Sequence, residues 1–226
     1  MRRDSRGWLA SCFIVVFVLF SIGCGGGDDR GPFVFTQLSD QNADGYISSE
    51  LDLGTGLPKV FSAAVTQSIQ VGVDEFAFEY RGFLDFPLAG LPLNADVRYA
   101  EIEVFVNAVP FAGNVPVLME LVDFQPPALI GSDFFRSAPE PFLPPILSRD
   151  IFTFLPGDAI IDPVTGFPPP VRIEVTTLVR EAQFRGQPDF QVRLLLDPAL
   201  GTAPPRIAIL DDGAADTAPL LYVEYF

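Results

Sequence analysis

The stretch that decides the fold is Glu75-Phe76-Ala77-Phe78-Glu79-Tyr80-Arg81-Gly82-Phe83-Leu84-Asp85-Phe86. Apart from Gly82, large apolar residues recur at every second position from Phe76 to Phe86, and most of the positions between them are charged. Because successive side chains of a strand point to opposite faces of a sheet, this pattern predicts a strand with one buried and one solvent-exposed face. We expect Phe83 to lie on the exposed, charged face.

Similar alternation recurs along the chain after each turn signal. We expect further strands over residues 97–106, 117–121, 151–154, 171–175, 190–196, 207–210 and 220–225. In the strand over 190–196, Gln191 and Arg193 should face solvent. The stretch 176–182 predicts one or two turns of helix, with a threonine as its cap. Many short strands and little helix predict a single all-β domain, an antiparallel β-sandwich of jelly-roll-like form.

Residues 125–170 differ from the rest because prolines interrupt them throughout. Proline removes a backbone donor and breaks long elements, so only 151–154 reads as a strand there. We interpret this region as a long Pro-rich connection that lies over the core. A connection of this length is either functional or loose.

The composition is strongly acidic and excludes several classes of function. The chain has 29 acidic and 14 basic residues, a net charge of −15, and no histidine. Such a charge repels nucleic acid, so we expect no nucleic-acid partner. Without histidine, the commonest general base and zinc ligand are missing. Two carboxylates could in principle hydrolyse a glycoside, but no motif selects a pair. We therefore expect a protein that is not an enzyme.

The N-terminal segment has the form of a secretory signal. Arg2, Arg3 and Arg6 precede an apolar run over residues 9–22, and the small residue Gly23 then stands before Cys24 in Ser21-Ile22-Gly23-Cys24. The apolar run is 14 residues long, shorter than the ~20 that span a bilayer. The alternative is an uncleaved membrane anchor.

The small residue before Cys24 resembles the end of a bacterial lipoprotein signal peptide, although that family usually has Leu where Ser21 stands. The resemblance implies a signal peptide over 1–23, cleavage before Cys24 and lipidation of its sulfur. It also implies an extracytoplasmic protein held on the membrane through Cys24, on the outer membrane or cell surface. We expect a flexible tether over 24–35 and the β-sandwich domain over 36–226. Both cysteines then belong to the signal, which leaves none for a disulfide.

The order of the strand motifs resembles the DNRLRE domain family of extracellular β-sandwich modules. The segments that carry the resemblance are RGFLDF (81–86), ADVRYAEIEV (95–104), EVTTLV (174–179), FQVRL (190–194) and PLLYVEY (219–225). Some members of that family are carbohydrate-binding modules, so the resemblance implies a polysaccharide ligand. Aromatic side chains on charged faces are the candidates to contact it: Phe83, Phe105 and Tyr222.

Two acidic turns are candidate Ca²⁺ sites. Asp40, Asn42 and Asp44 place oxygen atoms at alternate positions before Gly45, as in the first half of an EF-hand loop. The twelfth position of that loop is Leu51 rather than an acid, so this stretch can instead begin the first strand. The second turn carries Asp211, Asp212 and Asp216, which can equally be solvated charges.

Together these patterns predict a lipid-anchored, non-catalytic β-sandwich module that binds a glycan or another surface ligand. The alternative is a structural or adhesive surface lipoprotein that contacts proteins. A carboxylate-based glycan-active enzyme is the remaining possibility.

Overall fold

The computed structural model describes residues 31–111, 113–124, 128–135, 150–197 and 204–226, apart from the side chains of residues 150 and 151. The predicted signal peptide, Cys24 and most of the predicted tether lie outside these residues. The body from Phe33 to Phe226 forms one compact unit. None of the helices in the described ranges is long and apolar enough to cross a membrane.

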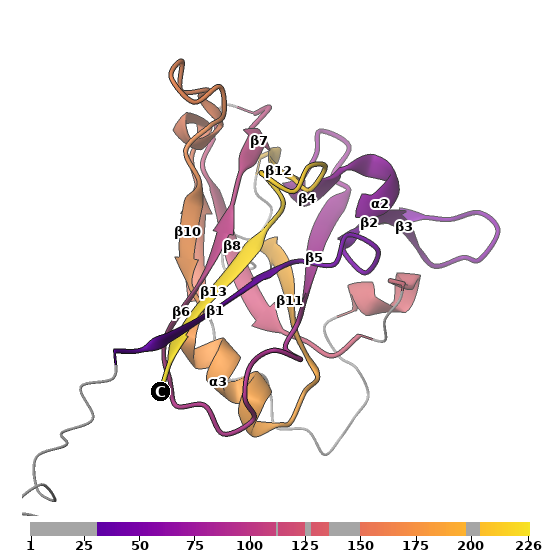
Figure 1. Ribbon diagram of the computed structural model, residues 1–226. Coiled ribbons are helices and arrows are strands. Elements are labelled where there is room, and N and C mark those ends of the chain that lie inside the picture. Colours follow the sequence, from indigo (N-terminus) through magenta and orange to yellow (C-terminus); the bar gives the residue numbers. More distant parts are fainter. Residues whose placement is uncertain (1–30, 112, 125–127, 136–149, 198–203) are drawn as a thin grey trace, which may run out of the picture. The chain divides into compact units, whose positions relative to one another are not determined.

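The domain is a sandwich of two antiparallel sheets, as the alternation predicts (Figure 1). The smaller sheet has four strands in the order β1 (Phe33–Leu38), β13 (Leu220–Tyr225), β6 (Val97–Val104) and β10 (Val171–Glu174). Its central pair joins the last strand of the chain to a strand from the middle of the sequence.

The larger sheet has nine strands. Seven follow in the order β7 (Val106–Ala108), β12 (Arg206–Asp211), β4 (Ser68–Val73), β5 (Glu79–Pro87), β11 (Asp189–Leu196), β8 (Val115–Leu121) and β9 (Asp150–Phe154). In addition, β2 (Gly45–Leu51) pairs with β5 and β3 (Pro58–Ser62), which forms a hairpin beside the main path.

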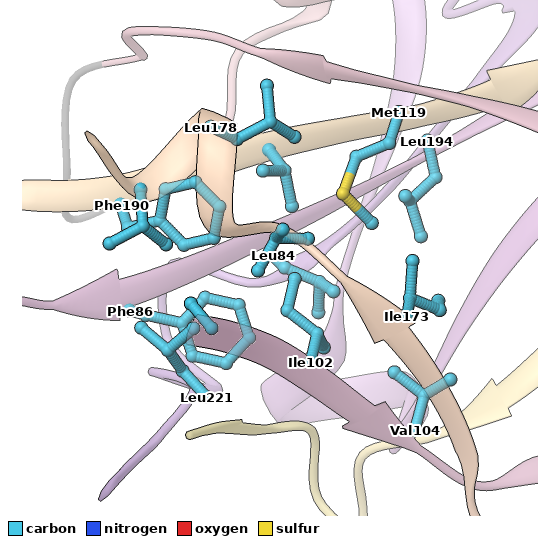
Figure 2. Packing of buried hydrophobic residues seen from close by; sticks show 14 of the residues in the cluster. Leu84, Phe86, Ile102, Val104, Met119, Ile173, Leu178, Phe190, Leu194 and Leu221 are labelled. Carbon is cyan, nitrogen blue, oxygen red and sulfur yellow. The ribbon is translucent and has the colours of Figure 1, made fainter. Parts of the chain in front are cut away.

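The main core lies between the two sheets (Figure 2). Leu84, Phe86, Met119 and Leu194 come from the larger sheet, and Ile102, Val104 and Leu221 come from the smaller one. At one end of the sandwich, helix α3 (Thr176–Phe184) adds Leu178 and Val179 to this core (Figure 1). Period-two alternation thus predicted the inward residues of these strands correctly.

The short helices lie in the connections. They are α2 (Ala63–Thr66) and the 3₁₀ turns η1 (Gly131–Phe134) and η2 (Pro156–Ala159). Helix α3 continues to Phe184, beyond the predicted 176–182, and its N-cap is Val175. Thr176 does not cap it. Its hydroxyl accepts the N–H of Ala100 at 2.9 Å and so links α3 to β6.

The predicted strand over 75–86 begins later than expected. β5 starts at Glu79, and Phe76 is 73% exposed. The cause is Asp74, whose Oδ1 accepts the backbone N–H groups of Phe76 and Phe78, each at 2.9 Å. This side chain closes a turn that the apolar alternation alone does not reveal.

The charged face of β5 and β11 is not exposed to solvent, so this prediction was wrong. Arg81, Asp85, Gln191 and Arg193 are all buried there. Phe83 is 1% exposed and belongs to a second apolar cluster. That cluster consists of Ala43, Ile47, Phe83, Phe124, Leu129 and Phe134. Leu129 and η1, both in the predicted Pro-rich connection, therefore cover this face of the larger sheet.

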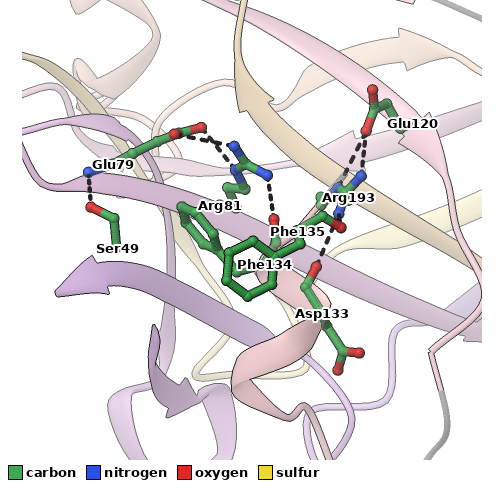
Figure 3. A network of polar contacts seen from close by, with 8 residues as sticks. All are labelled: Ser49, Glu79, Arg81, Glu120, Asp133, Phe134, Phe135 and Arg193. Atoms are coloured by element: carbon green, nitrogen blue, oxygen red, sulfur yellow. Dashed lines mark hydrogen bonds and ion pairs between the residues drawn. The ribbon is translucent and has the colours of Figure 1, made fainter. Parts of the chain in front are cut away.

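Ion pairs and backbone carbonyls accommodate the buried charges (Figure 3). Arg193 Nη2 lies 2.7 Å from Glu120 Oε2, and Arg193 Nη1 donates to the carbonyls of Asp133 and Phe135, each at 2.9 Å. The guanidinium of Arg81 stacks 4.0 Å from the Phe134 ring centroid and donates to the Phe134 carbonyl. Both arginines thus bind the layer that covers them.

The sandwich begins earlier than the predicted residue 36. β1 starts at Phe33, inside the range 24–35 that was predicted to be a tether. All six of its residues pair with β13, and the Phe33 ring lies 5.7 Å from the ring of Tyr225. The sandwich therefore includes residues 33–35.

Candidate functional site

The outer face of the smaller sheet carries tyrosines among glutamates. We call Tyr99, Glu101, Glu103, Arg172, Glu174, Tyr222 and Glu224 the acidic tyrosine face. Side chains alternate along each strand, so these residues point away from the core. The residues between them on β6 and β13 point into the core: Ala100, Ile102, Leu221 and Val223.

The strand register brings these residues together. Tyr222 of β13 lies opposite Glu101 of β6, and Glu224 lies opposite Tyr99. The two tyrosines are therefore diagonal neighbours on adjacent strands, a spacing of about 7–8 Å. Both are partly exposed. Together they form a short aromatic row on the sheet surface.

Hydrogen bonds to glutamates hold both phenol groups. The Tyr99 hydroxyl donates to Glu101 Oε2 at 2.6 Å, and the Tyr222 hydroxyl donates to Glu224 Oε1 at 2.8 Å. The hydrogen bond to Glu101 raises the pKa of Tyr99 to about 12. The bond to Glu224 likewise raises the pKa of Tyr222. Both phenols are therefore neutral at physiological pH.

The face has an excess of negative charge. It carries four glutamates and a single arginine, Arg172, whose Nη2 lies 3.1 Å from Glu103 Oε2. An anionic ligand would meet unfavourable charge here, whereas a neutral or cationic one would not.

The three predicted ligand-contacting aromatics do not lie together. Only Tyr222 is on the acidic tyrosine face. Phe83 is buried in the second apolar cluster and offers no ring to a ligand. Phe105 is half-buried between β6 and β7. Sequence reasoning missed Tyr99, although it lies in the predicted strand over 97–106 at the same alternating positions as Glu101 and Glu103.

The three predicted ligands of the first Ca²⁺ loop all take part in hydrogen bonds within the protein. Asp40 Oδ1 accepts both the backbone N–H and the side-chain amide of Asn42, each at 3.0 Å, which closes a tight turn. Asp44 instead points inward and is 1% exposed, and its Oδ1 accepts the N–H of Asp85 at 2.6 Å. Asp40 and Asp44 therefore accept different hydrogen bonds, one within the turn and one in the interior.

The second predicted loop likewise has one buried acid, while its other two acids are exposed or partly exposed. Asp216 is exposed, and Asp211 Oδ1 accepts the N–H of Gly213 at 2.9 Å. Asp212 is 2% exposed. Of the six predicted ligands, the fold buries Asp44 and Asp212 together, one from each loop.

The pKa values of both buried acids are raised, and Asp212 contributes to the shift of Asp44. Burial raises the pKa of Asp44 well above its usual value, and the charge of Asp212 adds to that effect. Burial, with a contribution from Asp211, raises the pKa of Asp212 to about 7. The Ser39 hydroxyl lies beside both carboxyls and partly lowers each pKa. No cluster of three or more acidic, His or Cys side chains suited to a metal occurs within the described ranges.

A small apolar hollow lies beside α3. Its lining includes Leu88, Leu91, Pro92, Gln183 and Pro188, and its volume is about 190 Å³. Small-molecule sites are typically about 300–1,000 Å³. This hollow is therefore a weaker candidate than the acidic tyrosine face.

No protein-family model matches the chain, and no curated protein matches its sequence.

Proposed function

We propose that the chain is a lipid-anchored, non-catalytic module that binds a neutral polysaccharide outside the cytoplasm. The observation that carries this proposal is the acidic tyrosine face, where Tyr99 and Tyr222 lie diagonally on adjacent strands. Aromatic rings pack on the apolar faces of sugars, as they do on other apolar groups. The neighbouring carboxylates accept hydrogen bonds from hydroxyl groups.

The charge of the face narrows the class of polysaccharide. Four glutamates surround the tyrosines, and the only positive group, Arg172, is paired with Glu103. Like charges repel acidic polymers from such a surface. The ligand class that fits is therefore a neutral glycan.

The anchor part of the proposal comes from the sequence. Cys24 follows the apolar run of a signal peptide, and residues 25–32 separate it from β1. Lipid on Cys24 would hold the sandwich at a membrane surface by this short segment. Intact-mass measurement of the membrane fraction tests this part. Cys24→Ala should remove the lipid mass and release the protein, and an unchanged membrane fraction would contradict lipid anchoring.

The binding experiment uses the full chain in detergent. Affinity electrophoresis against neutral and acidic polysaccharides should show retardation by a neutral polymer alone. Tyr99→Ala and Tyr222→Ala should each weaken binding about tenfold, the equivalent of one lost stacking contact. Phe76→Ala is the matched control, because Phe76 is an exposed aromatic on the β4–β5 turn, away from this face.

Two results would contradict the polysaccharide proposal. One is binding that survives the Tyr99→Ala/Tyr222→Ala double variant. The other is a folded chain that no neutral polymer retards.

The second result would favour the alternative, a surface protein that contacts other proteins. The β2–β3 hairpin supports this candidate, because it exposes Leu51, Leu53 and Leu57, of which Leu53 is completely exposed. Chemical cross-linking in intact cells should then give a protein adduct that Leu53→Ser removes. Leu93→Ser, at an exposed leucine outside the hairpin, is the control.

A further inference from the structure

Three segments of the chain meet beside the β1–β2 turn. The Gln41 side-chain amide donates to the carbonyl of Asp212. The N–H of Asp212 donates to the Gln67 carbonyl at 3.2 Å, and the N–H of Ala63 donates to the Asp44 carbonyl at 3.0 Å. The Gln41 side chain therefore links the two predicted acidic loops, and backbone hydrogen bonds hold each loop at one end of helix α2.

Four side-chain oxygens at this junction are buried and form no hydrogen bond of good geometry. They are Ser39 Oγ, Asp44 Oδ2, Asp212 Oδ1 and Asp212 Oδ2. The Ser39 hydroxyl lies close enough to both carboxyls to lower each pKa, but its single proton can satisfy at most one of their oxygens. A buried polar group without a partner costs free energy, and an isolated buried carboxylate costs far more. Buried charges in proteins are normally paired or bound to a metal.

The neighbouring groups do not supply the missing positive charge. In the described part of the chain, neither Asp44 nor Asp212 forms an ion pair. The other charges that act on the pair come from Asp40, Asp85 and Asp211, which are also acidic. The Gln41 amide is engaged by a backbone carbonyl rather than by a carboxylate.

We propose that this junction binds one Ca²⁺ ion through Ser39 Oγ, Asp44 Oδ2 and the carboxylate of Asp212. Two carboxylates balance the charge of a divalent ion. An all-oxygen set of ligands suits Ca²⁺ rather than zinc, which prefers nitrogen and sulfur. Mg²⁺ usually retains several waters in a regular octahedron, whereas Ca²⁺ accepts irregular sets of 6–8 oxygens. Backbone carbonyls and water would complete the coordination.

Such an ion would fasten distant parts of the sandwich. Ser39 follows β1 directly, and its N–H donates to the Pro219 carbonyl at 2.9 Å, next to β13. Asp44 precedes β2, and Asp212 follows β12. The ion would therefore join the ends of strands from both sheets. This inference stands independently of the polysaccharide ligand.

The test measures bound metal and thermal stability of the full chain in detergent. After exposure to Ca²⁺ and gel filtration, atomic emission should find about one calcium ion per chain. The melting temperature should be about 5 °C or more higher in millimolar Ca²⁺ than in chelator, because only the folded chain has the site. Mg²⁺ should give a smaller rise.

Variants at the site separate metal binding from folding. Asp212→Asn should lose the ion. In chelator it should melt no lower than the wild type, because its amide carries no charge to bury. Asp216→Asn is the control, since this exposed acid lies in the same loop and should retain the ion. Ser39→Ala should weaken Ca²⁺ binding several-fold.

Two outcomes overturn the proposal. One is a wild-type chain without calcium that melts at the same temperature in Ca²⁺ and in chelator. The other is a chain that retains the ion in Asp212→Asn and loses it in Asp216→Asn. If Asp212→Asn fails to fold, Asp44→Asn and Ser39→Ala decide: impaired binding in both supports the site, and undiminished binding in both overturns it.

Discussion

At Gly72, near the end of β4, the backbone has φ +135°, a conformation that residues with side chains rarely adopt. A Cβ there would overlap the carbonyl oxygen of Arg206 on the neighbouring strand β12. Gly72→Ala should therefore destabilise the protein by about 2–4 kcal/mol. Denaturant unfolding measures this change. Gly157→Ala, where nothing lies within 4 Å of the added atom, should change stability by less than about 0.5 kcal/mol. Equal effects of the two substitutions would contradict the close approach of β4 and β12.

Tyr80 provides a prediction of pH dependence. Its hydroxyl donates to Asp74 Oδ2 at 2.9 Å, and burial together with this bond raises its pKa to about 12. A pKa above the usual value of 10.0 means that folding favours the neutral phenol. The resulting stability is fully present below pH 10 and is lost as pH rises through the folded pKa.

The phenolate absorbance of wild type minus Tyr80→Phe, followed through alkaline pH, measures the titration of Tyr80. It should rise near pH 12. Asp74→Asn should shift this rise to lower pH, because it removes the negative charge while its amide oxygen can still accept hydrogen bonds. A difference curve with its midpoint near pH 10 would show that Tyr80 and Asp74 do not interact.

Among the elements, η1 depends on two arginines from the larger sheet. Arg193 is 3% exposed, pairs with Glu120 and donates to two carbonyls at η1 (Figure 3). Arg193→Ala removes the guanidinium that lies 2.7 Å from Glu120 and leaves the glutamate charge buried. It should cost about 3–5 kcal/mol in the free energy of unfolding.

Denaturant unfolding of matched variants checks this expectation. Arg98→Ala is the control, because Arg98 forms an exposed ion pair with Asp96 at 2.7 Å, and such pairs contribute about 0–1 kcal/mol. Replacing both Arg193 and Glu120 by methionine should recover much of the loss, because neither charge of this pair then remains buried. A loss as small as that of Arg98→Ala would mean that this ion pair does not hold the covering layer.

At the scale of the whole molecule, the net charge of −15 opposes compaction. Salt screens repulsion between exposed charges, so the melting temperature of the full chain in chelator should rise by a few degrees as NaCl increases at neutral pH. Near pH 4, where many carboxylates are protonated, the same salt series should have little effect. A melting temperature that falls with salt at neutral pH would mean that attractive pairs outweigh the net repulsion.

The sequence by itself determined the fold class and most of the strands. Predictions over 97–106 and 220–225 correspond closely to β6 and β13, and their inward residues lie in the core. The physical reason is local. Alternation of side chains is intrinsic to an extended backbone, so a strand's two faces can be identified from its own residues.

Only the tertiary structure decided which outer face is covered and which acids meet. Phe83 and Arg193 alternate as an exposed face would, but Phe124, Leu129 and η1 bury them. Asp44 and Asp212 belong to loops that the sequence treats as separate, and the approach of β1, β2 and β12 buries them together. These outcomes depend on contacts between segments far apart in the chain, and no local pattern encodes them.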